Sequence, residues 1–78
     1  MVLTELRPGE AAFIEEVRIE GRLGRRLLAL GFVPGTAVRV CRRAPLGDPT
    51  EYELRGTRLC LRSSEAKQIH VCRRTRES

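Results

Sequence analysis

The chain has no tryptophan, and two phenylalanines and one tyrosine are the only aromatic residues among its 78 residues. Aromatic side chains supply the largest buried areas, so a core with few of them must be built mostly from leucine, isoleucine and valine. A domain of this size buries only about 60% of the surface that its unfolded chain exposes. It can spare little apolar contact for a large cavity, so we expect one domain over residues 1–78 and no deep active site.

Long hydrophobic runs are also absent. The most apolar stretch, residues 27–33, is much shorter than the ~20 residues that a membrane-spanning helix needs. The N-terminus does not resemble a secretory signal, because the charged residues Glu5, Arg7 and Glu10 come too early. We therefore expect a cytoplasmic protein that reaches a membrane only through a partner.

Residue types used in catalysis are scarce. His70 is the only histidine, Asp48 is the only aspartate, and the serines are Ser63, Ser64 and Ser78. Asp48 lies in a loop rich in glycine and proline, where turn formation explains it, and Ser63 or Ser64 is expected to cap a helical turn. A Ser-His-Asp triad needs its three side chains within hydrogen-bond reach, and no glycine-rich loop opens a helix to hold a phosphate. We expect no enzymatic activity.

Cysteine is sparse, with three residues and no Cys-x-x-Cys pair, which argues against a disulfide framework and fits a reducing compartment. Cys60, His70 and Cys72 alternate with the apolar residues of their predicted strands, and His70 and Cys72 share a strand face. These three residues are the candidate ligands for zinc or iron(II). Their spacing matches no structural zinc motif, so we predict no cofactor beyond adventitious metal. A small metal-binding regulatory domain stays open as an alternative.

The formal charge is +5, with fourteen arginines and one lysine against ten acidic residues. Such a charge suits nucleic acid, an acidic protein surface or anionic lipid. The acids are interspersed with arginines, as in residues 15–18 and 51–55, which is typical of an ordinary solvated face. Because few aromatics are present to stack on bases, nucleic-acid binding by a basic barrel is kept only as an alternative.

Periodicity predicts short strands separated by tight turns. Strands are expected at residues 11–19, 36–43, 52–54, 59–61 and 69–71, and the first should contain a bulge because its apolar residues fall out of phase. A helical turn over residues 3–6 precedes the first strand, another over residues 63–68 precedes the last, and residues 73–78 should fray. This pattern predicts a mainly β, five-stranded SH3-like barrel, although an OB-like barrel has the same strand count.

One helix is predicted at residues 22–30, after the first strand. Leu23, Leu27 and Leu30 fall on one helical face, and Gly31 suits a left-handed C-terminal cap. Gly24 inside the helix costs about 1 kcal/mol relative to alanine. Its presence indicates either a close packing contact or a later helix start.

Two surfaces are candidates for binding a partner. The leucines of the predicted helix span too broad an arc for all of them to point inward, so one is expected to stay accessible with the exit loop, beside the helix arginines. The loop at residues 44–49 is the second candidate, because its prolines lower the ordering cost of binding. The candidate partner-binding residues are Arg25, Arg26, Leu27, Leu28, Phe32, Val33, Pro45 and Leu46.

Several motifs resemble those of the FeoA family. They occur in the order Leu3-x-x-Leu6-x-Pro8-Gly9, Leu27-x-x-Leu30-Gly31-Phe32-x-Pro34-Gly35, Ala44-Pro45-Leu46-Gly47-Asp48-Pro49 and Ile69-His70-Val71. The resemblance covers nearly the whole chain and implies an SH3-like barrel associated with bacterial ferrous-iron uptake. It also implies a cytosolic accessory subunit or regulator of FeoB, a membrane transporter for Fe(II) that carries a GTP-binding domain.

This resemblance leaves two mechanisms open. A GTPase-activating role needs an arginine inserted toward the nucleotide, and Arg25 and Arg26 are the candidates. Docking that favours one conformational state of the transporter asks less of the chain, and we prefer it. No nucleic acid is expected as a partner, and weak homo-oligomerisation is left open.

Overall fold

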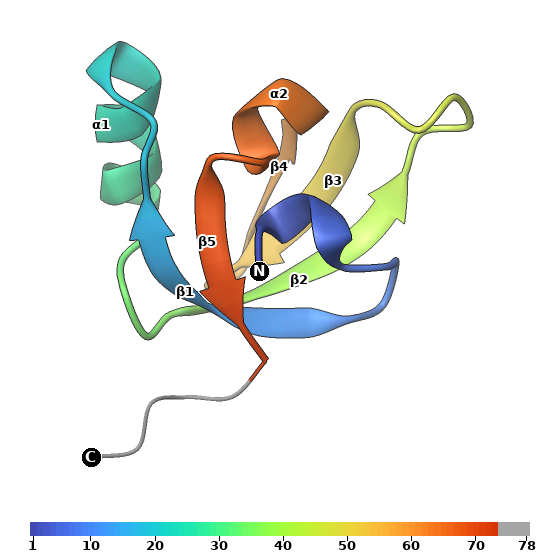
Figure 1. Cartoon of the computed structure of the whole chain (residues 1–78), viewed down its shortest axis with the longest axis horizontal. Coiled ribbons are helices and arrows are strands. Elements are labelled where there is room, and N and C mark those ends of the chain that lie inside the picture. Colours follow the sequence, from blue (N-terminus) through green and yellow to red (C-terminus); the bar gives the residue numbers. More distant parts are fainter. Residues whose placement is uncertain (74–78) are drawn as a thin grey trace.

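Five strands and three helices make up the described part of the chain, residues 1–73, in the computed structural model (Figure 1). In chain order they are the 3-10 helix η1 (Leu3–Glu5), β1 (Ala11–Val17), α1 (Gly21–Leu30), β2 (Ala37–Arg43), β3 (Thr50–Leu54), β4 (Thr57–Leu61), α2 (Ser63–Ala66) and β5 (Ile69–Cys72). All the predicted elements are present. Residues 74–78 of the predicted tail lie outside the described residues.

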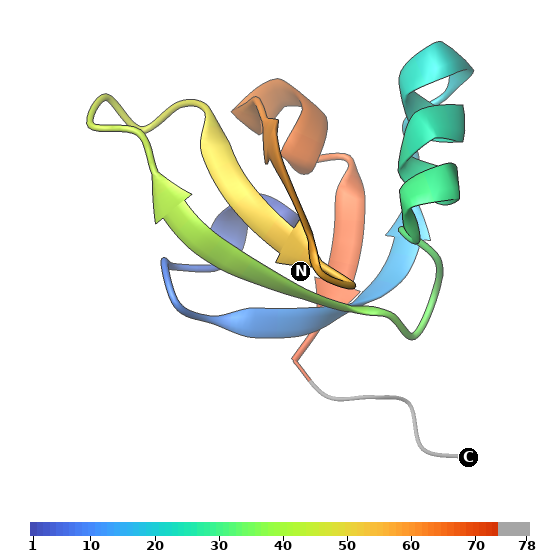
Figure 2. The same cartoon turned by 180° about the vertical axis from the view of Figure 1, so that it is seen from behind.

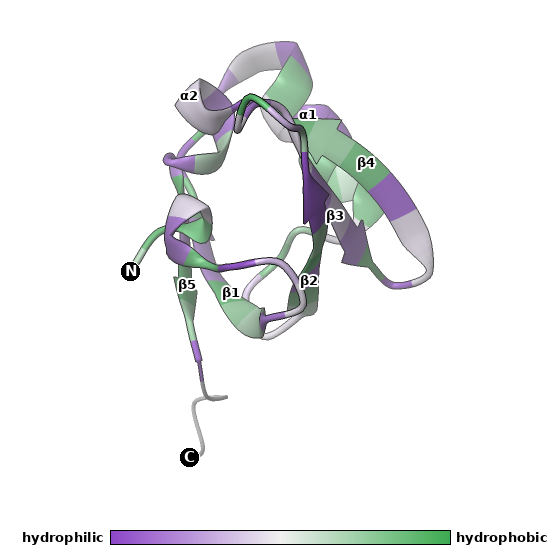
Figure 3. Cartoon of the chain, turned by 90° about the vertical axis from the view of Figure 1, so that its right-hand side faces the viewer, coloured by the Kyte–Doolittle hydropathy of each residue, from purple (hydrophilic) through white to green (hydrophobic). Residues whose placement is uncertain are grey.

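The strands form one antiparallel sheet in the order β4-β3-β2-β1-β5. The sheet curls around an interior that the chain encircles (Figure 3). The bulge predicted in the first strand is confirmed, because the β1–β5 register shifts between Ile14 and Glu16. The outer edge of β5 is covered by the N-terminus: Val2 bridges His70, and the Val71 N–H donates to the Met1 carbonyl over 2.8 Å. The predicted SH3-like barrel is confirmed.

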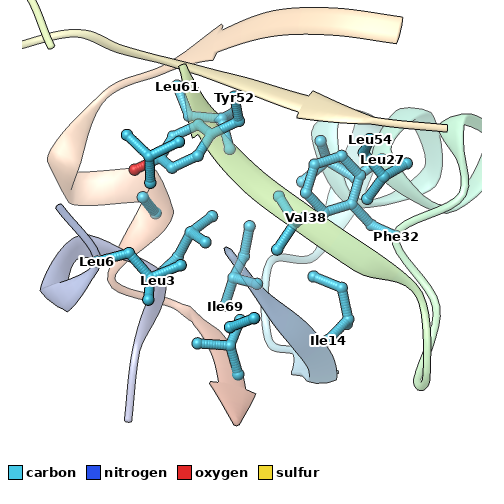
Figure 4. Packing of buried hydrophobic residues seen from close by; sticks show 14 residues of the cluster. Leu3, Leu6, Ile14, Leu27, Phe32, Val38, Tyr52, Leu54, Leu61 and Ile69 are labelled. Carbon is cyan, nitrogen blue, oxygen red and sulfur yellow. The ribbon is translucent and has the colours of Figure 1, made fainter. Parts of the chain in front are cut away.

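The core is mostly aliphatic, as the scarcity of aromatics predicts. Tyr52 and Phe32 are its largest side chains, and they lie among leucines, isoleucines and valines from every strand and from η1 and α1 (Figure 4). No helix among residues 1–73 is long and apolar enough to cross a membrane. Side chains from all five strands and from the helices therefore fill the interior of a small barrel.

The serine cap predicted for the second helical turn is wrong. The helix α2 begins at Ser63 itself, and its N-cap residue is Arg62, whose N–H donates to Glu65 Oε1 over 2.8 Å. The Ser63 N–H donates a hydrogen bond to Asp48 Oδ1 over 2.8 Å, from a position 15 residues later in the sequence. Asp48 therefore ties the β2–β3 loop to α2, which sequence spacing alone does not reveal.

Alkaline pH is expected to destabilise the domain through Tyr52, which is 1% exposed and hydrogen-bonded to the Thr50 side chain. Burial is the main cause that raises the pKa of Tyr52 above its ordinary value of 10.0. As pH rises past that value, the unfolded chain therefore loses the phenolic proton of Tyr52 before the folded chain does. The free energy of unfolding should then fall by up to about 1.4 kcal/mol per pH unit. Below that pH, the stabilisation by the neutral Tyr52 is fully present.

Denaturant unfolding of the wild type and of Tyr52→Phe, between about pH 8 and about pH 11, tests this expectation. At neutral pH, Tyr52→Phe should lower the free energy of unfolding by about 1 kcal/mol, because it removes the hydrogen bond to Thr50. At alkaline pH, the stability of the variant should decline less than that of the wild type, because no phenol is left to ionise at this position. Parallel pH profiles for the two proteins would contradict the assignment to Tyr52.

Candidate functional site

The helix α1 stands beside the barrel and exposes most of its length (Figure 1). Of its ten residues only Leu27 is fully buried, while Leu23 and Leu30 are partly buried against the core. Gly31 caps the helix in the left-handed region with φ 112°, as predicted. The apolar stripe thus attaches α1 to the barrel, and the remaining surface faces solvent.

Three arginines and one leucine lie on that solvent-facing surface. Arg22, Arg25 and Arg26 are spaced i, i+3 and i+4, so they share one side of the helix, and all three are exposed. Leu28 is 61% exposed. Within residues 1–73 none of the three guanidinium groups has an ion-pair or hydrogen-bond partner. Leu28 comes three residues after Arg25 and is its neighbour on the helix surface, whereas Arg26, two residues before Leu28, points away from it. An accessible apolar side chain beside an unpaired cation is a suitable centre for a protein contact.

The predicted partner-binding set divides between this surface and the core. Leu28 is the accessible leucine, whereas Leu27 is 0% exposed. The expected accessibility of Phe32 is wrong, since it is 2% exposed. The left-handed cap at Gly31 reverses the chain, the Phe32 N–H donates to the Leu27 carbonyl over 2.9 Å, and the ring turns into the core (Figure 4). Val33 is half-buried.

The loop at residues 44–49 forms the second predicted surface, and Leu46 at its tip is 97% exposed beside the exposed Pro45. The loop is closed by the Ala44 N–H, which donates to the Pro49 carbonyl over 3.0 Å. This loop and α1 lie at opposite ends of the longest axis, as Figure 1 and the reverse view in Figure 2 both show. The two candidate surfaces are therefore separate.

The three candidate metal ligands do not form one site. Cys60 is exposed on β4, and His70 and Cys72 are half-buried on β5, at the other end of the strand order. Cys60 lines a hollow with Arg42 and Glu51, whereas His70 and Cys72 line a different one. Among residues 1–73 no group of three or more His, Cys, Asp or Glu side chains is placed to hold a metal ion. Within residues 1–73, Cys41, Cys60 and Cys72 form no disulfide.

The hollow beside β5 is the larger of these two, with a volume of about 750 Å³. It lies between β1, β5 and the loop after α1, and its walls include the half-buried Phe13 and His70 and the exposed Glu16 and Pro34. Sequence reasoning missed it, because its residues come from three separated segments and match no local motif. Its mixed walls identify no ligand class.

Four acidic side chains among the described residues are paired with arginine side chains of the barrel. Arg39 hydrogen-bonds Glu53 across β2 and β3, and this hydrogen bond is the main cause that lowers the pKa of Glu53. The Arg7 N–H, and after it Arg73, similarly lower the pKa of Glu10. Further ion pairs join Arg18 to Glu16 and Arg42 to Glu51. The arginines of α1 take part in none of these ion pairs, and neither do Arg55, Arg58 and Arg62 of the barrel.

Comparison with known proteins identifies relatives over nearly the whole described chain. The FeoA domain family matches residues 1–73. A fusion of Fe(2+) transport protein A with the Fe(2+) transporter FeoB from Porphyromonas gingivalis is 41% identical in an alignment of 73 residues that covers 91% of this chain. The chain spans only 8% of the length of that fusion protein.

Solved structures agree with this result. The FeoA protein of Chlorobium tepidum is 43% identical, with a TM-score of 0.87, and the match covers 92% of this chain and 69% of that protein. FeoA of Stenotrophomonas maltophilia, solved in complex with zinc, is 39% identical with a TM-score of 0.80, and the match covers 91% of this chain and 88% of that protein. By sequence and by fold, this chain is a member of the FeoA family.

Proposed function

We propose that the chain is a non-enzymatic accessory subunit of a ferrous-iron transporter, and that it docks on the cytosolic part of FeoB through α1. The observation that carries this proposal is the solvent-facing surface of α1, where Leu28 is accessible beside Arg25 and where Arg22 and Arg26 are also exposed. The Porphyromonas gingivalis relative supports the choice of partner, because it joins a FeoA and a FeoB in one polypeptide. Through this partner, a cytoplasmic domain would be held at the membrane.

Docking requires less of this chain than catalysis does. The Asp48 carboxylate accepts a hydrogen bond from the Ser63 N–H, so this carboxylate has a structural role. The candidate arginine fingers, Arg25 and Arg26, project from a helix that is already exposed, so they can contribute to a contact without rearrangement. Binding that prefers one state of the transporter then shifts its conformational equilibrium by the difference in affinity for the two states.

Calorimetric titration of the chain against the cytosolic region of the cognate FeoB, with and without a GTP analogue, tests the proposal. Leu28→Ala should lower the affinity by about tenfold, because it removes an apolar contact at the centre of the interface. A difference in affinity between the nucleotide states would indicate regulation of the transporter.

The matched control is Lys67→Glu, an exposed charge reversal at the C-terminus of α2, outside α1. This variant should bind as the wild type does, and each variant is first checked for its unfolding midpoint. Absence of binding in every nucleotide state would overturn docking on the cytosolic region of FeoB.

A further inference from the structure

The turn between β3 and β4 contains an arginine in an unfavourable backbone conformation. Leu54 pairs with Thr57, so Arg55 and Gly56 alone form the turn, with φ of 53° and 80°. Two left-handed residues define a type I′ hairpin, for which Asn-Gly is the preferred sequence. An arginine at the first position costs about 1 kcal/mol relative to residues that tolerate this region. Hairpin formation alone therefore does not account for Arg55.

The side chain of Arg55 extends over the C-terminal end of α1. A Cβ atom built on Gly31 would lie 2.6 Å from Arg55 Cδ and 3.3 Å from Arg55 Nη1. A cation at this end of a helix is favoured by the helix dipole. Leu28 lies three residues before Gly31 and thus on the same side of the helix. The turn consequently brings a guanidinium group to the C-terminal end of α1, on the side of the helix that carries Leu28.

These residues define what we name the arginine face. It consists of Leu28 with Arg25 and Arg55 beside it, together with Arg22 and Arg26, which lie further around the exposed side of α1. Like the helix arginines, Arg55 has no ion-pair or hydrogen-bond partner within residues 1–73. Glu20, just before α1, is the only acid from residue 18 to residue 35. The face therefore carries positive charge that no described acidic side chain pairs with, and a partner of opposite sign would complement it.

We propose that the arginine face binds an acidic protein surface on the transporter, with the guanidinium groups on carboxylates and Leu28 in an apolar contact. This inference rests on the proposed docking function and adds the chemistry of the partner surface and a role for Arg55 in positioning it. Guanidinium groups match carboxylates in bidentate geometry, which favours arginine over lysine here.

An acidic protein fits this face better than nucleic acid or a lipid surface. The arginine face holds no aromatic side chain on which a base could stack, since Phe32 and Tyr52 are buried and Phe13 lies on β1. An interfacial membrane helix inserts a broad apolar stripe, whereas the apolar stripe of α1 is turned toward the barrel core and leaves Leu28 alone exposed. A carboxylate-bearing surface needs only the charges and the single leucine that are present.

Affinity for the cytosolic region of FeoB, measured from about 50 to about 300 mM salt, tests the inference, because salt screens exposed charge pairs. The affinity of the wild type should fall by at least about tenfold over this range. At low salt, Arg55→Asn should weaken binding by about threefold to fivefold, and Arg55→Lys should weaken it less. Asparagine tolerates the left-handed turn, so Arg55→Asn should be at least as stable as the wild type. Arg25→Glu should cost at least about tenfold.

The outcomes separate this inference from the docking proposal. If the affinity for the cytosolic region of FeoB does not change with salt concentration and is the same for Arg55→Asn and Arg25→Glu as for the wild type, the inference of an acidic partner surface is wrong. The proposed docking on FeoB would still stand. Absence of binding at any salt would overturn both. The chain is also titrated against vesicles of phosphatidylserine and phosphatidylcholine and against a mixed single-stranded RNA. If it binds one of these more tightly than it binds the cytosolic region of FeoB, and if Arg55→Asn and Arg25→Glu lose that binding, the proposed acidic protein partner is wrong and that ligand takes its place. Lys67→Glu again serves as the charge-matched control.

Discussion

Leu27→Ala is expected to lower the free energy of unfolding by about 3 kcal/mol, whereas Leu28→Ala should change it by less than about 0.5 kcal/mol. The two leucines are neighbours on α1, but Leu27 is 0% exposed and Leu28 is 61% exposed. Removing the Leu27 side chain leaves a cavity where the helix meets the barrel, and few other contacts of α1 can compensate for it. Truncating Leu28 removes atoms that already face water.

Urea unfolding of both variants, followed by far-ultraviolet circular dichroism, gives the comparison directly. Because the chemical change is the same at both positions, differences in side-chain size and helix propensity cancel. Equal losses at the two positions would show that α1 is rotated relative to its described orientation, and would remove the basis for assigning Leu28 to a binding surface. Binding experiments with Leu27 variants report on folding and cannot test docking.

Gly24→Ala should destabilise the domain by about 2 to 3 kcal/mol. Helix propensity alone predicts the opposite sign, a gain of about 1 kcal/mol. A Cβ atom at Gly24 would lie 2.1 Å from the Ile19 carbonyl oxygen and 3.0 Å from its carbonyl carbon. Since both atoms belong to the backbone, relief requires moving α1 or the segment that leads into it. The sign of the measured change therefore decides between packing and propensity.

The control for this experiment is Ala29→Gly at an exposed position of the same helix. It should cost about 1 kcal/mol through propensity alone. Thermal and urea unfolding of both variants provide two independent measurements. If Gly24→Ala proves more stable than the wild type, the close approach of α1 to Ile19 is wrong.

The strands and the helix were predictable because each follows from a local pattern. The alternation in β2, the leucine stripe of α1 and the glycine at its C-terminus are signals within about ten residues. Gly24 was recognisable as an anomaly, and the structure explains it by a close packing contact. Phe32 was misassigned because its burial depends on the direction in which the chain leaves Gly31, which hydrophobicity does not encode.

The roles of single arginines were not predictable. From composition alone, every arginine is expected to lie on a solvated face of the protein. In the structure, Arg43 is half-buried and donates to the Leu6 carbonyl over 2.8 Å and to Thr50 Oγ1 over 3.1 Å, which ties η1 to the sheet. Arg55 reaches α1 across the β3–β4 turn. The contact between Arg43 and Leu6 joins positions 37 residues apart, and such contacts need tertiary structure to be seen.

The separation between Leu28 and Leu46 bears on how many molecules the domain can hold at once. Its longest extent is 39 Å, and the two leucines belong to elements at opposite ends of it (Figure 1). A contact of ordinary size covers about 800 Å² on each partner, roughly one seventh of the 5227 Å² that this chain exposes. A contact centred on α1 therefore leaves the far loop uncovered. If α1 binds the transporter as proposed, a second component could bind the far loop at the same time.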